Sequence, residues 1–278
     1  SAATLSAGVE TVRRRHELVD APGYTLQHPT DRLAGGLVRA TYANYRTQPF
    51  SISPENGVAL SVAVRRRWDL EPHEAANETY TEATSWGAAY RALPLFGFAN
   101  HVIAARVSSL RRDGPGADPV EIGGASGASG ILALGGLGTA VATRRFLPLR
   151  GFEPGVRRGT RAWTASLEHR FPIALIGRGH RLWPFFIDRL SGALFLDAGA
   201  AWCSAAQQAA DIRCRTQTDV DDGFRFLGHP TLAAAGAEIG LDLAFLFSGT
   251  VRLRAGVAAP LAGPHTGARF HITLGPSF

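Results

Sequence analysis

Apolar side chains occur at every second position in several segments of the chain. Residues 58–64 have valine or leucine at each even position, with alanine or serine between them. Residues 251–257 and 270–274 show the same alternation, with arginine, glycine, histidine or threonine in between. A period of two places successive side chains on opposite sides of a β-strand. The pattern therefore predicts strands with one apolar face and one polar face.

About ten such segments are present, each close to the ~10 residues that a tilted strand needs to cross a bilayer. Residues 130–143 either extend a further strand or belong to a loop. The expected strands span residues 2–14, 34–47, 55–68, 79–91, 97–110, 160–171, 190–202, 232–246, 249–259 and 268–278.

The connections between these segments alternate between short and long. Short ones lie at 48–57, 93–97 and 248–249, and long ones span 15–33, 69–78, 111–159 and 203–231. Outer-membrane barrels have short periplasmic turns and long external loops. The connection 172–189 departs from this scheme, since it is long where a turn is expected.

Alternation alone fits a soluble barrel as well as a membrane barrel. The polar partner is often arginine, as at Arg65, Arg106, Arg252 and Arg254. A small soluble barrel could place these side chains outside but could not bury them without matching carboxylates. The loop pattern favours the membrane, and only a closed barrel lets a sheet span lipid. We therefore predict an all-β, antiparallel transmembrane barrel of about 10–12 strands.

Composition excludes a disordered chain, because 45% of the 278 residues are hydrophobic and 19% are charged. The net charge is +6, and all 29 basic residues are arginine. A GC-rich genome would explain the arginine bias; the alternative is a surface or lumen that prefers anionic partners. The most apolar stretch, 130–142, is too short and too glycine-rich for a membrane-spanning helix.

Three motifs in order carry a family resemblance: residues 149–152 (LRGF), 160–172 (TRAWTASLEHRFP) and 190–202 (LSGALFLDAGAAW). They precede an alternating strand that ends in an aromatic residue. This order resembles the C-terminal barrel of the outer-membrane assembly-factor superfamily, the bacterial surface antigen family, which includes the BamA and TamA types. The resemblance is densest over 146–278 and continues more weakly through 51–57 and 101–110.

The resemblance implies that a long external loop folds back into the lumen, where its arginine meets acidic and aromatic groups of the next two strands. The glycine at the loop tip would allow a tight turn, and Gly199 would leave space for the loop. The alternative is a solvated loop with Asp197 as an ordinary lumen residue. The matching positions are Arg150, Gly151, Phe152, Glu168, Phe195, Asp197 and Gly199.

The strand pattern independently places Glu168 and Asp197 on the lumen side of their strands. An arginine between two carboxylates can form paired, charge-assisted hydrogen bonds and stack on Phe195. The last strand, with Phe270, Ile272, Leu274 and Phe278, resembles the recognition signal of outer-membrane barrels. The alternative is a simple closing strand. In the family, the first and last strands meet at a weak seam.

Cys203 and Cys214 lie close together in the long loop after Trp202. In a protein placed outside the cytoplasm, such a pair predicts a disulfide more than a metal site. Trp163 and Trp202 lie near strand ends and suit interfacial aromatic girdles, with ordinary packing as the alternative. The arginine runs 13–15 and 65–67 lie at strand ends, where we expect lipid phosphates or lipopolysaccharide to bind them.

No phosphate-binding loop, Gly-x-Ser-x-Gly elbow or His-Glu-x-x-His motif occurs in the sequence. We therefore expect no catalytic residue, no metal and no cofactor, and no binding of nucleic acid. The expected partners are outer-membrane lipids and lipopolysaccharide, with client polypeptides or a periplasmic domain as further candidates.

The sequence thus predicts one transmembrane barrel domain over 1–278, as the C-terminal part of a longer protein in the bacterial outer membrane. The resemblance implies an assembly or translocation factor that aids insertion or passage of polypeptides. The alternatives are a passive pore or an anchor for a periplasmic domain, and a barrel-embedded enzyme, which no motif favours.

Overall fold

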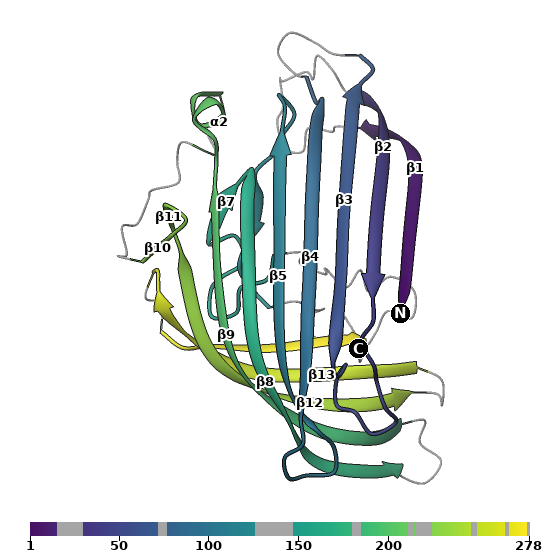
Figure 1. Ribbon diagram of the computed structural model, residues 1–278. Coiled ribbons are helices and arrows are strands. Elements are labelled where there is room, and N and C mark those ends of the chain that lie inside the picture. Colours follow the sequence, from purple (N-terminus) through teal and green to yellow (C-terminus); the bar gives the residue numbers. More distant parts are fainter. Residues whose placement is uncertain are drawn as a thin grey trace.

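The computed structural model describes residues 1–15, 30–71, 77–125, 147–179, 185–210, 214, 224–245, 249–264 and 267–276. Its main element is one antiparallel sheet of ten strands, in the order β1-β2-β3-β4-β5-β8-β9-β12-β13-β14 (Figure 1). The strands are β1 (Ala2–Arg15), β2 (Thr30–Ala43), β3 (Gly57–Asp69), β4 (Tyr80–Leu93), β5 (His101–Asp113), β8 (Arg161–Gly179), β9 (Phe185–Trp202), β12 (Leu232–Phe245), β13 (Gly249–Ala262) and β14 (Arg269–Pro276).

Each of the ten expected segments corresponds to one strand of this sheet, so the all-β, antiparallel prediction is confirmed. The long turn expected at 172–189 is wrong, because β8 continues to Gly179 and β9 begins at Phe185. Pro172 does not end β8, since the pairing with β9 shifts register just after it, between Pro172 and Ala174. Such a bulge absorbs a residue that cannot donate to the ladder.

The connections after β1, β3, β5, β9 and β13 leave one end of the sheet, called here the long-loop end. The connections after β2, β4, β8 and β12 lie at the other end, the turn end. The three longest connections, 16–29, 114–160 and 203–231, all lie at the long-loop end, as expected. The alternation is not regular, however, because 44–56 at the turn end is longer than 70–79 and 263–268 at the long-loop end.

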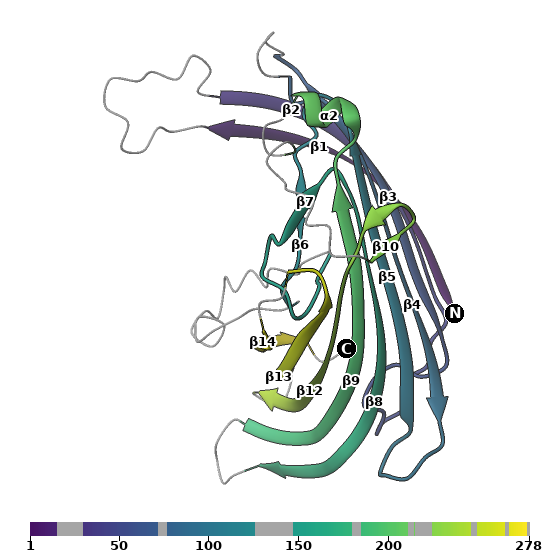
Figure 2. The same ribbon diagram turned by 90° about the vertical axis from the view of Figure 1, so that its left-hand side faces the viewer.

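The sheet is strongly curved but open. Within the described residues, β1 pairs only with β2, and β14 pairs only with β13. Figure 2 shows the strands curving around a concave side that contains β6 (Val120–Ile122) and β7 (Arg157–Gly159). The structure therefore shows the curved antiparallel sheet but not the closed barrel that the sequence predicts.

The two sides of the sheet differ in polarity. On the convex outer face, Val62, Leu167 and Leu196 are each at least 50% exposed. On the concave inner face the buried side chains are largely polar, as at Asp197 and Asp242. Most large apolar residues of the described strands thus point away from the molecule, and the charged residues point into it beside one apolar core.

The chain between β5 and β8 packs against the inner face through a small apolar core. Loop residues such as Leu149 and Phe152 meet strand residues such as Leu110 and Leu232 there. The core comprises Leu110, Ile122, Leu147, Leu149, Phe152, Ala162, Ala201, Leu232 and Ala234.

A short helix and a small hairpin lie between β9 and β12: α2 (Ala205–Ala210), β10 (Arg225–Phe226) and β11 (His229–Pro230). No helix in the described part of the chain is long and apolar enough to cross a membrane.

Candidate functional site

The loop that carries Arg150 is anchored immediately before that residue. Leu149 is fully buried in the apolar core and pairs through its backbone with Gly124. Gly151 follows with a φ of +87°, a left-handed conformation that favours glycine. A Cβ at Gly151 would lie 2.9 Å from the Cβ of Ala234 on β12. The loop therefore turns tightly and touches the sheet, as the sequence predicts for this glycine.

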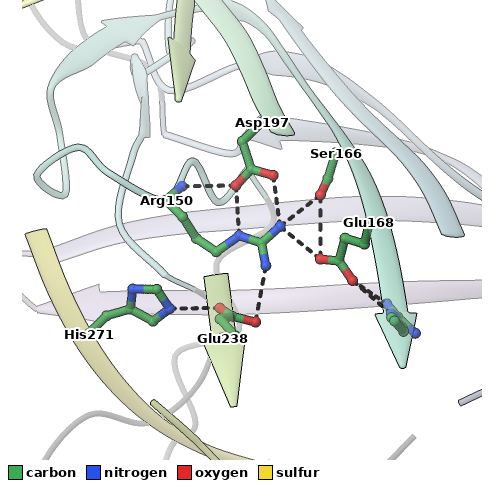
Figure 3. A network of polar contacts seen from close by, with 7 residues as sticks. Arg150, Ser166, Glu168, Asp197, Glu238 and His271 are labelled. Atoms are coloured by element: carbon green, nitrogen blue, oxygen red, sulfur yellow. Dashed lines mark hydrogen bonds and ion pairs between the residues drawn. The ribbon is translucent and has the colours of Figure 1, made fainter. Parts of the chain in front are cut away.

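Arg150 is the centre of a buried polar network on the inner face, shown in Figure 3. Its Nε donates to Oδ2 of Asp197 at 2.7 Å, and one Nη donates to Oδ1 at 2.8 Å. The backbone N–H of Arg150 also donates to Asp197, at 3.2 Å. The guanidinium is 5% exposed and the Asp197 side chain 3%. Asp197 thus holds both the side chain and the backbone of the loop tip.

Two further carboxylates complete the surroundings of the guanidinium. Glu168 on β8 lies 2.7 Å from one Nη, and Glu238 on β12 lies 3.1 Å from the other. Ser166 accepts a hydrogen bond of 2.8 Å from the same Nη that contacts Glu168. The network therefore joins the loop to three neighbouring strands, β8, β9 and β12.

Two further side chains contact the glutamates of this network. Arg170 lies 2.7 Å from Glu168, and His271 Nε2 lies 2.6 Å from Glu238. Burial opposes the charged form of Arg150, but Glu168 and Asp197 favour it more strongly, so the pKa of Arg150 lies well above its ordinary value. Arg150 is consequently a permanent cation in this site.

Phe195 lies on one face of the arginine, with the guanidinium carbon 3.5 Å from the ring centroid. This is a cation–π arrangement, which gains strength where water is excluded. The ring also lies 6.5 Å from the ring of His271. The structure thus brings Arg150, Glu168, Phe195 and Asp197 together, on the strands and faces that the sequence indicates.

The other two predicted residues lie close by in different surroundings. Phe152 is buried in the apolar core, 3.2 Å from where a Cβ at Gly263 would lie. A Cβ at Gly199 would instead meet Trp163 O at 2.9 Å and Thr164 Cγ2 at 3.0 Å, both on β8. Gly199 therefore relieves crowding between neighbouring strands, and the expectation that it makes space for the loop stays a prediction.

A second polar cluster lies toward the turn end. Arg252 on β13 contacts Asp242 through two nitrogens at 2.5 and 2.6 Å and donates to the carbonyl of Ile52 at 2.8 Å. Arg189 on β9 donates to the carbonyl of Ser51 at 2.6 Å. The connection between β2 and β3, residues 44–56, is thereby tied to distant strands; we call it the strap. A cavity of about 360 Å³ lies between the strap and these strands.

A third cluster involves the arginine run 65–67. Arg67 lies 2.8 Å from Glu10, and Arg65 lies within 4 Å of Glu10 and Glu82. Both arginines occupy inner-face positions, because they pair across the sheet with Gly35 and Leu37, whose partners in β1 are Glu10 and Gly8. Strand alternation turns both side chains toward these carboxylates, and the binding of lipid phosphates by this run stays a prediction. Arg13 of the other run is exposed.

The terminal strand places its apolar residues on the outer face at a free edge. Phe270 is 85% exposed and Ile272 62%. Leu274 has the same parity and pairs with Leu253 of β13. Phe278 lies outside the described residues. The role of these residues as a recognition signal stays a prediction.

The predicted disulfide is confirmed, since Cys203 and Cys214 are bonded to each other. Trp163 and Trp202 lie at the long-loop end, where each contacts the β10–β11 hairpin. The Trp163 ring meets Phe226 edge-on at 5.4 Å, and Trp202 stacks on His229 at 3.9 Å.

Sequence reasoning missed Glu238 and His271 as members of the network. A signal for Glu238 existed. It is one of two acidic residues, with Asp242, at the inner positions of the alternating segment 234–242, and the other inner positions there are alanine and glycine. No local signal marked His271, since its contact with Glu238 depends on the register between β12, β13 and β14.

Comparison with known proteins does not identify this chain: no protein-family model and no curated protein matches it. The site is therefore interpreted from its geometry.

Proposed function

We propose that this chain forms a transmembrane β-barrel domain in the bacterial outer membrane, of the type that aids insertion or passage of polypeptides. The observation that carries the proposal is the polarity of the sheet. Its outer face exposes large apolar side chains on most strands, while its inner face buries charged networks. Exposed residues include Leu5, Val9, Val38, Leu60, Val62, Val64, Val107, Leu167, Leu194, Leu196, Ile239, Phe270 and Ile272.

This polarity is the reverse of that of a water-soluble barrel. Soluble monomers rarely expose a contiguous apolar patch larger than about 600 Å². An apolar belt with a polar interior is typical of transmembrane barrels, whose strands alternate between lipid and lumen. The gathering of the three longest connections at one end of the sheet supports the same proposal, with the long-loop end outside the cell.

Membrane insertion requires that the free edges of β1 and β14 be paired, because unpaired backbone groups are costly in lipid. The ten consecutive strands alternate in direction, so β1 and β14 are antiparallel and suited to pair with each other. An edge that opens could instead template an incoming client strand by β-augmentation. The network at Arg150 would then hold the lumen loop against β8, β9 and β12 while the seam between β1 and β14 opens.

The loop on the concave side favours an assembly factor over a passive open pore. Its residues Arg150 and Phe152 are packed against the inner face, so they occupy space that an open channel would need. An anchor for a periplasmic domain is the remaining alternative, and it predicts no effect on client folding.

The proposal is tested by refolding the chain into lipid vesicles and measuring protease protection, bilayer conductance and the folding rate of an added outer-membrane barrel. We expect strands to be protected, conductance to be low and client folding to be accelerated. A steady large conductance without acceleration would identify a pore. Failure of the strands to become protected would overturn the membrane assignment itself.

A further inference from the structure

The hairpin β10–β11 presents an apolar tip on the outside of the molecule. Its turn contains Leu227 and Gly228, both with positive φ, at +53° and +79°. The hairpin base is held by Thr231, whose N–H donates to the carbonyl of Phe224 at 2.9 Å and whose Oγ1 accepts from the N–H of Phe226 at 3.2 Å. Phe224, Leu227 and the residues between them therefore form a defined element.

The hairpin rests on the outer face of the main sheet. Trp163 and Trp202 are paired across β8 and β9 with Ala200 and Arg161, and they share the outer side with Leu167 and Leu196. Phe226 and His229 contact these two tryptophans. The hairpin thus continues the exposed apolar belt at the long-loop end.

Leucine at position 227 of the turn is unfavourable for folding, because the backbone there has a positive φ. Glycine, asparagine or aspartate suits a hairpin position with positive φ, whereas leucine is rare there. Leu227 is nevertheless 74% exposed, and Phe224 and Phe226 are each 48% exposed. Arg225, between the two phenylalanines, is exposed as well. A tip with aromatic and aliphatic groups around a cation matches the lipid–water interface, where aromatic rings and arginine anchor proteins.

We propose that the β10–β11 hairpin docks into the lipid–water interface at the long-loop end, with Leu227 and Phe226 among the acyl chains and Arg225 at the phosphates. This inference rests on the proposed membrane function and extends it, because it assigns a lipid contact to a loop element outside the strands. Lipid is the occupant because the tip is continuous with the apolar belt and carries a cation beside the aromatic residues.

The experiment uses tryptophan quenching by brominated phospholipids in vesicles of phosphatidylcholine and phosphatidylglycerol. Three variants each add one tryptophan to the full chain. Leu227→Trp probes the hairpin tip, Asn77→Trp probes an exposed polar loop at the same end, and Val62→Trp probes the outer face of β3. Circular dichroism checks that each variant folds like the parent protein.

We expect brominated lipid to quench the added emission of Leu227→Trp and Val62→Trp and to leave that of Asn77→Trp unchanged. Quenching at Val62→Trp but not at Leu227→Trp would overturn the hairpin proposal while the membrane proposal stands. Quenching at neither position would overturn both. Burial of Leu227→Trp against a second protein copy would appear as emission that is protected from lipid and depends on protein concentration, which also contradicts lipid docking.

Discussion

At the scale of single residues, the central question is how one arginine is tolerated in a buried position. Arg150 contacts Asp197, Glu168 and Glu238, while Arg170 and His271 bind the outer oxygens of the two glutamates. Buried charges are stable only when partners and hydrogen bonds replace water. Each member of the network therefore depends on the others, and removing the central cation leaves three carboxylates close together.

We predict that Arg150→Ala lowers the free energy of unfolding by about 3–5 kcal/mol, the usual cost of leaving buried charges without their partner. Arg150→Lys should lose less, because it keeps the charge but not the bidentate geometry. Denaturant unfolding of the chain in vesicles measures both variants.

Arg158→Ala is the matched control, because Arg158 is half exposed and pairs with Glu121 at the surface. Such pairs contribute about 0–1 kcal/mol. Equal stability of Arg150→Ala and Arg158→Ala would contradict a structural role for the network.

At the scale of elements, the strap behaves differently from an ordinary turn. Ile52 is 2% exposed, although it lies in a connection rich in Pro, Ser and Asn. Arg252 donates to its carbonyl and Arg189 to that of Ser51, and both arginines lie on strands far away in the sequence. Figure 1 shows this connection passing from β2 and β3 toward β12 and β13. The strap thus links β2 and β3, near one edge of the open sheet, to β9 and β13, toward its other edge.

We predict that Arg189→Ala releases the strap without unfolding the sheet. The hydrogen bonds that Arg189 donates to the carbonyls of Ser51 and Pro49 would be lost. Hydrogen bonds from charged donors are worth about 1.5–3 kcal/mol, so amide exchange at residues 46–55 should accelerate roughly tenfold or more. Hydrogen–deuterium exchange with mass spectrometry measures this.

Arg269→Ala is the control at the long-loop end, because Arg269 pairs with Glu153 in the other connection that crosses the concave side. It should leave exchange in the strap unchanged. Unaltered exchange in Arg189→Ala would show that Arg252 and the packing of Ile52 hold the strap without Arg189.

At the scale of the whole molecule, the two free edges decide what the sheet can do. Ten strands with an apolar outer face resemble part of a barrel wall, yet the edge backbones of β1 and β14 have no partner among the described residues. In water such edges are templates for pairing. In lipid they are strongly unfavourable, so the surrounding medium sets the driving force for closure.

We predict that transfer from detergent to a lipid bilayer selectively slows amide exchange in β1 and β14. Central strands such as β4 and β5 already have partners on both sides and should change less. Exchange measured in both media distinguishes the outcomes. Closure in the membrane would be contradicted if amide exchange in β1 and β14 were as fast in lipid as in detergent while the central strands were protected.

Part of the candidate site could be predicted because strand parity is a local property. Glu168 and Asp197 each sit in an alternating segment, so their common face follows from the sequence once the segments are strands. The pairing of His271 with Glu238, and of Arg252 with the strap, could not be predicted. Those contacts depend on register and on how a curved sheet brings distant strands together.

The sequence by itself determined the ten strands, their antiparallel class, the polarity of their two faces and the position of the three longest connections, since these depend on residues that are near neighbours in the chain. The tertiary structure decided which carboxylates Arg65 and Arg67 contact, which strand crowds Gly199, where the strap binds and that the edges are open. Each of these depends on long-range packing, where burial and paired charges outweigh local preference.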